Sequence, residues 1–173
     1  MRSTDWGVEG TGLKVPKGRL RSDCIYAIIL GVARIVVVDT DVFVSALLGG
    51  GAANEVIAEC LRGRFAPLMG VALFSEYESI LRRPRQFARS RLNTVEREEL
   101  LDIFLSVCRW TRVYYAWRPN LRDESDNHVV ELAVAGGATA IVTRNVRDYR
   151  IGPQLKFPHI EILTPVHLLK GES

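Results

Sequence analysis

Two carboxylates, Asp39 and Asp41, directly follow a short apolar run at residues 35–38. The run is mostly β-branched, which is typical of a buried strand. Ligands bind at the carboxyl ends of the parallel strands in open α/β sheets, and carboxylate oxygens suit a hard cation such as Mg²⁺. The spacing therefore indicates a metal site after this strand. The simpler alternative is that Asp39 ends the strand while Thr40 or Asp41 caps the next helix.

Further polar groups follow other predicted elements. Residues 123–127 (DESDN) place three acids before a helical pattern, although a cap needs one, and their mutual repulsion calls for a cation or an arginine. A helix expected over 71–83 carries Glu76 and Glu78, which flank its apolar stripe about equally. Periodicity leaves the choice between them open. A later apolar strand leads directly into the polar residues Thr143, Arg144, Asn145 and Asp148.

The segment 82–91 is strongly basic and contains no acid. Its arginine side chains match phosphate oxygens in bidentate geometry, which makes the segment a candidate contact for a nucleic-acid backbone. A solvated loop or a surface for an acidic protein is the alternative. The residues concerned are Arg82, Arg83, Arg85, Arg89 and Arg91.

Length and composition bound the remaining choices. The chain has 173 residues and is 47% hydrophobic, which is the size of one domain with a substantial core. Its three cysteines are widely spaced, which argues against a disulfide framework or a zinc site and favours a reducing cytosol. We find no apolar run of membrane-spanning length and expect a soluble, cytoplasmic protein. Residues 1–33 read as a disordered extension, and the domain is expected at 34–170.

Strand and helix patterns alternate along that domain. Since such alternation produces a parallel sheet covered by helices on both faces, the fold class is α/β. Asn93 and Glu96 are spaced as a capping box. The expected strands are 35–38, 65–70, 111–115, 138–143 and 160–163, and the expected helices are a short one after the first strand, then 52–61, 71–83, 93–108, 126–135 and one from 165.

Four motifs in this order carry a resemblance to a known family: the strand with Asp39 and Asp41, then 75–84 (SEYESILRRP), 123–127 (DESDN) and 141–145 (IVTRN). Over about residues 34–168 the chain resembles the PIN domain, and more narrowly the VapC-like ribonuclease toxins of bacterial toxin–antitoxin pairs. The resemblance implies a Rossmann-like three-layer sandwich with a five-stranded parallel sheet. It also implies Mg²⁺- or Mn²⁺-dependent endonuclease activity, mostly on single-stranded RNA.

The resemblance also assigns roles to residues. Asp39, Glu76 and Asp126 match the acids that hold the metal, with Asp123 as a close neighbour of the third. Asn145 matches a fourth position, where many relatives carry Asp, and Asp41 stands where Asn is commoner. Thr143 and Arg144 are then expected near the scissile phosphate. An antitoxin that covers the acidic groove, and a homodimer, are the partners that the family implies.

Two other functions fit parts of the sequence. A phosphatase of the haloacid-dehalogenase type also opens with a strand and Asp-x-Asp, and Asp39 would then be a nucleophile. Phe43 departs from that pattern, and Lys156 is the one lysine between residues 18 and 169. A catalytically inert PIN-like module that binds RNA or an acidic partner is the third reading, and Asn145 keeps it open.

Overall fold

A parallel sheet forms the centre of the computed structural model, which describes residues 33–49, 51–114, 121, 124–149, 157 and 159–171. The expected extension, except residue 33, and Asp123 lie outside these residues. The strands run parallel in the order β3-β2-β1-β4-β5, which confirms the predicted five-stranded parallel sheet. Their bounds are β1 Arg34–Val38, β2 Phe65–Met69, β3 Arg109–Trp110, β4 Ala140–Val142 and β5 Glu161–Leu163.

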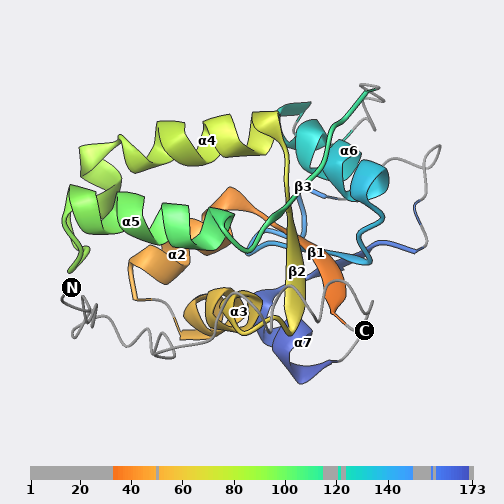
Figure 1. Ribbon diagram of the computed structural model, residues 1–173, viewed down its shortest axis with the longest axis horizontal. Helices are drawn as coiled ribbons and strands as arrows, with labels where there is room; N and C mark the ends of the chain where they lie inside the picture. Colours follow the sequence, from red (N-terminus) through yellow and green to blue (C-terminus); the bar gives the residue numbers. More distant parts are fainter. Residues whose placement is uncertain are drawn as a thin grey trace, which may run out of the picture.

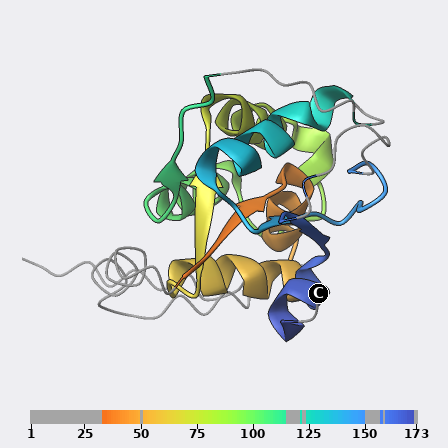
Figure 2. The same cartoon turned by 90° about the vertical axis from the view of Figure 1, so that its right-hand side faces the viewer.

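Helices cover both faces of this sheet (Figures 1 and 2). Figure 2 shows α3 and α7 on one side, with α4 and α6 on the other. This arrangement buries the second half of β1, where Val36, Val37 and Val38 are at most 1% exposed. The helices are α2 Thr40–Leu47, α3 Gly51–Leu61, α4 Val71–Leu81, α5 Thr94–Leu105, α6 Asn127–Gly136 and α7 Pro165–Lys170.

The helix ends follow the local signals, with small shifts from the predicted bounds. Asn93 and Glu96 form the expected capping box at the start of α5. Pro84 follows α4, which ends two residues earlier than predicted, at Leu81. The prediction for β3 was wrong by two residues: the strand is Arg109–Trp110, and the Thr111 N–H continues the pairing by donating to the Met69 carbonyl at 2.8 Å.

Helices α2 and α3 are short and largely buried in the core. Among the described residues no single helix is long and apolar enough to cross a membrane. In the part of the chain that the structure describes, one bent pair, α2 with α3, has the length and composition for it when the two helices are taken together.

A buried aromatic cluster connects α4 to the end of β1. Phe43 of α2 contacts Tyr77 of α4 at a centroid distance of 4.8 Å and Phe104 of α5 at 5.3 Å. The Tyr77 hydroxyl donates a hydrogen bond of 2.9 Å to the carbonyl of Val38, the last residue of β1. Since Glu76 precedes Tyr77 and Asp39 follows Val38, this bond fixes two acidic positions relative to each other.

We expect the Tyr77→Phe substitution to lower the free energy of unfolding by about 1 kcal/mol, because it removes one buried hydrogen bond while keeping the ring. Tyr114→Phe is the matched control, since Tyr114 is 78% exposed and its change should leave stability within about 0.5 kcal/mol of the wild type. Urea unfolding of both variants measures the difference. Equal stability of the two variants would contradict the role given to the Tyr77 hydroxyl.

Candidate active site

Asp39 stands at the carboxyl end of β1, in the middle of the sheet. It is the N-cap residue of α2, yet its side chain makes no capping hydrogen bond. The Tyr149 hydroxyl donates to Asp39 Oδ2 at 2.8 Å, and the Thr143 hydroxyl also hydrogen-bonds the carboxylate. The carboxylate is therefore held by residues that follow β4. Asp39 does more than end the strand.

Burial and neighbouring charge act on this carboxylate together. Burial raises the pKa of Asp39, and the charge of Glu76 raises it further, while the hydrogen bonds from Tyr149 and Thr143 oppose the rise. Burial and the charges of Asp39 and Asp126 likewise raise the pKa of the Tyr149 phenol. The tyrosine therefore stays protonated and keeps donating to Asp39. The charge of Glu76 thus acts on Asp39, and the charges of Asp39 and Asp126 both act on Tyr149.

Asp41 is placed differently from the expected cap. Its carboxylate accepts the backbone N–H of Arg144, at 2.9 Å to Oδ2 and 3.2 Å to Oδ1. Burial, followed by the charge of Asp39, raises the pKa of Asp41 from 3.8 to about 6. Asp41 thus fixes the chain after β4 beside the end of β1, and the residues after the two central strands form one unit.

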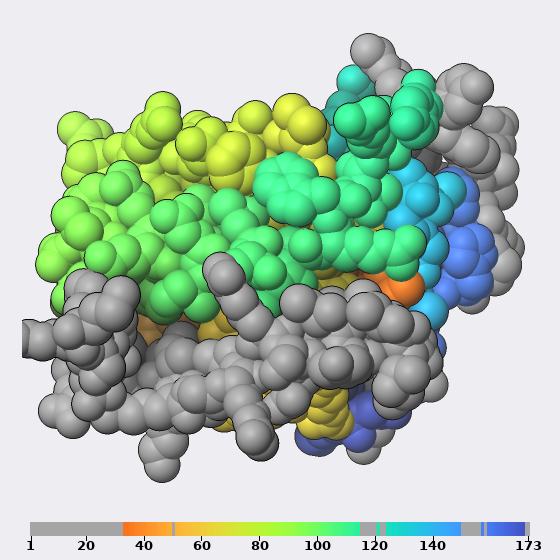
Figure 3. Space-filling model, in the orientation of Figure 1, coloured from red at the N-terminus to blue at the C-terminus, as the bar shows by residue number. Residues whose placement is uncertain are grey.

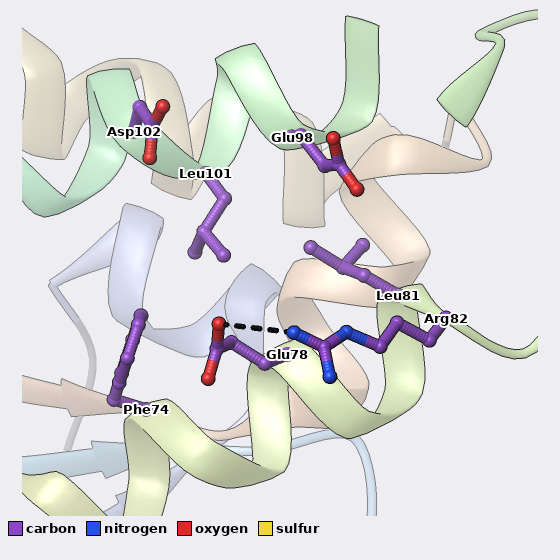
Figure 4. Close-up of a pocket in the computed structure, with 7 residues that line it drawn as sticks. All are labelled: Phe74, Glu78, Leu81, Arg82, Glu98, Leu101 and Asp102. Carbon is purple, nitrogen blue, oxygen red and sulfur yellow. Dashed lines mark ion pairs between the residues drawn. The ribbon is translucent and has the colours of Figure 1, made fainter. Parts of the chain in front are cut away.

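The structure separates Glu76 from Glu78, which periodicity could not do. Glu76 carries charge that reaches Asp39. Glu78 instead lines a cavity of about 290 Å³ between α4 and α5, together with Glu98 and Asp102 of α5, and pairs with Arg82 at 3.5 Å (Figure 4). Of these two glutamates, Glu76 is the one that belongs to the acidic group around Asp39.

His128 of α6 is the immediate neighbour of Glu76. Its Nε2 lies 3.1 Å from Glu76 Oε2, so the two side chains form an ion pair when the imidazole is protonated. Neither of these two buried atoms has an aligned hydrogen bond. The imidazole holds the pKa of Glu76 below its usual range. Burial opposes the charged imidazole, but the contact with Glu76 and the Ser125 carbonyl raise the pKa of His128 overall. The Thr40 hydroxyl, also buried beside Glu76, has no aligned partner either.

Asp126 stands where the 3-10 turn Glu124–Asp126 meets α6. It is the N-cap residue of α6, but its side chain makes no capping hydrogen bond. Its charge acts on His128 and on Tyr149, which contact Glu76 and Asp39 respectively. The three expected acids are thus linked through two shared neighbours, and capping does not account for Asp126.

Asn145, the fourth expected site residue, has its side chain bonded to Asp148. The Asn145 side chain is exposed and donates to Asp148, while its backbone N–H donates to the Thr143 hydroxyl at 3.0 Å. In this conformation the Asn145 amide is engaged by Asp148. Its role in orienting water or phosphate stays a prediction.

The arginine segment forms an exposed loop with a buried anchor. Arg82, Arg83, Arg85, Arg89 and Arg91 are all exposed. Phe87 within the loop and Leu92 just after it are buried. The Arg97 guanidinium lies 4.5 Å from the Phe87 ring and donates to the Leu92 carbonyl at 2.8 Å. Arg83 is close enough to lower the pKa of Glu76 through its charge. The loop therefore begins beside the acidic group.

The donors present suit a hard divalent cation, but they do not yet form a complete ligand set. Carboxylate and hydroxyl oxygens are the ligands that Mg²⁺ and Mn²⁺ prefer. The buried, unaligned oxygens of Glu76 and Thr40 are what a cation would satisfy. Within the described part of the chain, however, no three His, Cys, Asp or Glu side chains converge as metal ligands. Asp39, Glu76 and Asp126 would have to move closer together than they stand here to share one cation.

Sequence reasoning missed three residues of this region. His128 showed no metal-ligand spacing, Arg97 lay in a segment read only for its helical pattern, and Tyr149 closed a segment read for its polar oxygen donors. A polar residue on the first turn of α6, two positions after Asp126, was the signal available for His128. Tyr149 contacts Asp39 across 110 positions of sequence, and no local pattern reports such a contact.

Comparison with known proteins bears on this arrangement. The family model of the PIN domain matches residues 35–147, a span that contains Asp39, Glu76, Asp126 and Asn145. The fold is similar to a chain in the crystal structure of VapBC2 from Rickettsia felis bound to a DNA fragment from their promoter, with a TM-score of 0.51 and 17% identity over 75% of this chain and 98% of that one. No curated protein matches the sequence.

The raised pKa of Asp41 predicts a pH dependence of stability that Asp41→Asn removes. Between about pH 4 and pH 6 Asp41 keeps a proton in the folded protein that it has lost in the unfolded chain, so its contribution to the free energy of unfolding falls as pH rises through this window. Asparagine keeps an oxygen for the Arg144 N–H but carries no charge. We therefore expect the free energy of unfolding of Asp41→Asn, relative to that of the wild type, to be higher at about pH 7 than at about pH 4, as measured by urea unfolding in EDTA. The opposite trend would show that the Asp41 carboxylate is stabilised by folding.

Proposed function

Because the chain belongs to the PIN domain family, we propose that it is a Mg²⁺- or Mn²⁺-dependent endoribonuclease, and the toxin of a toxin–antitoxin pair. The observation that carries the proposal is the gathering of Asp39, Glu76 and Asp126 around His128 and Tyr149 at the carboxyl edge of the sheet. Family membership favours this reading over the phosphatase, in which Asp39 would be a nucleophile.

In this proposal Asp39, Glu76 and Asp126 hold the cation. A bound divalent ion supplies two things that phosphodiester hydrolysis needs, a water of lowered pKa and neutralisation of the phosphoryl oxygens. The protein supplies the positioning. Tyr149 and Thr143 orient Asp39, His128 contacts Glu76, and Asp41 accepts the backbone N–H of Arg144, whose side chain would contact the phosphate. Asn145 is proposed to contact water or phosphate after leaving Asp148.

The exposed arginine loop supports RNA as the substrate. Arg83 lies within electrostatic reach of Glu76, and Arg85, Arg89 and Arg91 continue from it along the surface. Such a row can follow the phosphates of a strand whose scissile group is at the carboxylates. Arg82 is partly engaged by Glu78 but remains 76% exposed.

The partners are proposed from relatives. The similar structure is of VapBC2 with DNA from its promoter, which supports an antitoxin as the partner of this chain. An antitoxin segment that places an arginine next to these carboxylates would offset the repulsion among them, as a cation would. A homodimer and a cytoplasmic location are further parts of the proposal.

One specific observation favours a second function, an inert PIN module that binds RNA or protein. Asp39 accepts from Tyr149, Glu76 is paired with His128 and Asn145 with Asp148, so expected site residues are engaged within the chain. Metal-dependent cleavage separates the two functions.

The test is cleavage of total cellular RNA by the purified chain with Mn²⁺ or with EDTA. We expect discrete cuts that require Mn²⁺ and that fall by roughly 100-fold or more in Asp126→Asn, since one charge at the site is lost. Asp102→Asn is the matched control, because Asp102 is an exposed aspartate in the cavity between α4 and α5.

Cleavage that persists in EDTA, or in Asp126→Asn at the level of Asp102→Asn, would contradict the assigned site. No cleavage with any metal would favour the inert module.

A further inference from the structure

Residues 109–114 (RWTRVY) form a strip that contains two arginines and two aromatic residues. Arg109, Trp110, Arg112 and Tyr114 are all exposed, Trp110 by 53% and Tyr114 by 78%. The strip contains no acid. In the space-filling view this green segment, β3 and the residues after it, is open to solvent beside the yellow start of α4 (Figure 3). Exposed aromatic faces interleaved with arginines are how proteins bind single-stranded nucleic acid.

The strip is held in place by its neighbours. The Thr111 N–H donates to the Met69 carbonyl at 2.8 Å, which continues the pairing of β3 with β2. The Trp110 ring contacts Phe74 of α4 edge to face at 5.7 Å. The Trp110 ring is thus positioned relative to α4, so less conformational entropy is lost when a base stacks on it.

A hollow of about 670 Å³ separates the end of the strip from the starts of α4 and α6. Val71, Val113 and Tyr114 give it apolar walls, and His128 and Glu131 contribute polar groups. Hollows of this size hold small organic ligands, and a nucleobase is such a group. His128 also contacts Glu76 at 3.1 Å, so the hollow lies directly beside the acidic group.

We propose that this hollow and the strip bind unpaired bases next to the scissile phosphate. One base enters between Tyr114 and Val71, the neighbouring base stacks on Trp110, and Arg109 and Arg112 contact the phosphates between them. This assignment rests on the proposed function for the identity of the strand as substrate. It differs from the arginine loop at 82–91, which follows the backbone alone, because stacking requires unpaired bases.

The test is fluorescence anisotropy of a labelled oligouridylate of about eight nucleotides with the full chain in EDTA, so that no metal-dependent cleavage occurs. Tyr114→Leu should weaken binding roughly ten-fold or more, since base stacking on one aromatic ring contributes that much. Tyr114→Phe keeps the ring and should bind like the wild type. Val166→Ala, a change at another exposed apolar residue on α7, is the matched control. The same oligonucleotide annealed to its complement should bind both Tyr114 variants equally.

Trp110→Leu is the second variant, and its stability is measured first because Trp110 packs on Phe74. We expect Trp110→Leu to weaken binding of the single-stranded oligonucleotide and to leave binding of the duplex unchanged. If affinity for the single strand and for the duplex falls equally, the strip contacts only the nucleic-acid backbone and the proposal is wrong.

Unchanged RNA affinity in Tyr114→Leu, with a wild-type dimer that becomes monomeric in this variant, would assign the strip to contact between copies. The outcome is independent of the cleavage assay. If RNA binding depends on Tyr114 but no RNA is cleaved, the proposed nuclease function is wrong and the base-binding site stands. If RNA is cleaved and Tyr114→Leu leaves the KM unchanged, the base-binding site is wrong and the nuclease function stands.

Discussion

Repulsion between carboxylates gathered at the carboxyl edge of a parallel sheet is the constraint on which the rest of this structure depends. Asp39 lies where burial and Glu76 both disfavour its charge, and Asp41 is raised in pKa by burial and Asp39. A fold that keeps such groups together must supply compensating donors. It does so from two parts of the chain: the segment after β4 gives the Tyr149 hydroxyl and the Arg144 backbone N–H, and α6 gives the His128 imidazole. Each donor lies far in sequence from the acid that it contacts.

The scaffold makes this gathering unavoidable. β1 is the central strand, with β2 and β4 on either side, so residues that follow β1 and β4 emerge side by side. The Asp39 N–H donates to the Val142 carbonyl at 2.9 Å, which brings the two strand ends together. The Tyr77 hydroxyl then fixes α4 to Val38. Tyr77 is 1% exposed, and its burial decides which side of α4 faces the site. Core packing and site geometry are therefore set by the same contacts.

Much of this could be predicted because it depends on local pattern. The β-branched run of β1, the alternation of strands and helices, and the capping box at Asn93 are local signals, and the structure confirms all three. The choice between Glu76 and Glu78 was not local. It depends on how α4 rotates when Tyr77 enters the core, and on α5, which encloses Glu78 in a separate cavity. The partnership of Tyr149 with Asp39 and the hollow beside Tyr114 arise only when distant segments pack together.

The central claim is that Asp39, Glu76 and Asp126 share one divalent cation, and that Glu78 does not take part. Thermal unfolding with and without Mn²⁺, in the wild type, Glu76→Gln and Glu78→Gln, tests it without reference to any substrate. At a Mn²⁺ concentration about 100 times the dissociation constant, binding should stabilise the wild type and Glu78→Gln by about 2.7 kcal/mol. Glu76→Gln should lose most of this stabilisation. A wild type that does not respond to Mn²⁺, or an equal response in the two glutamine variants, would contradict the account.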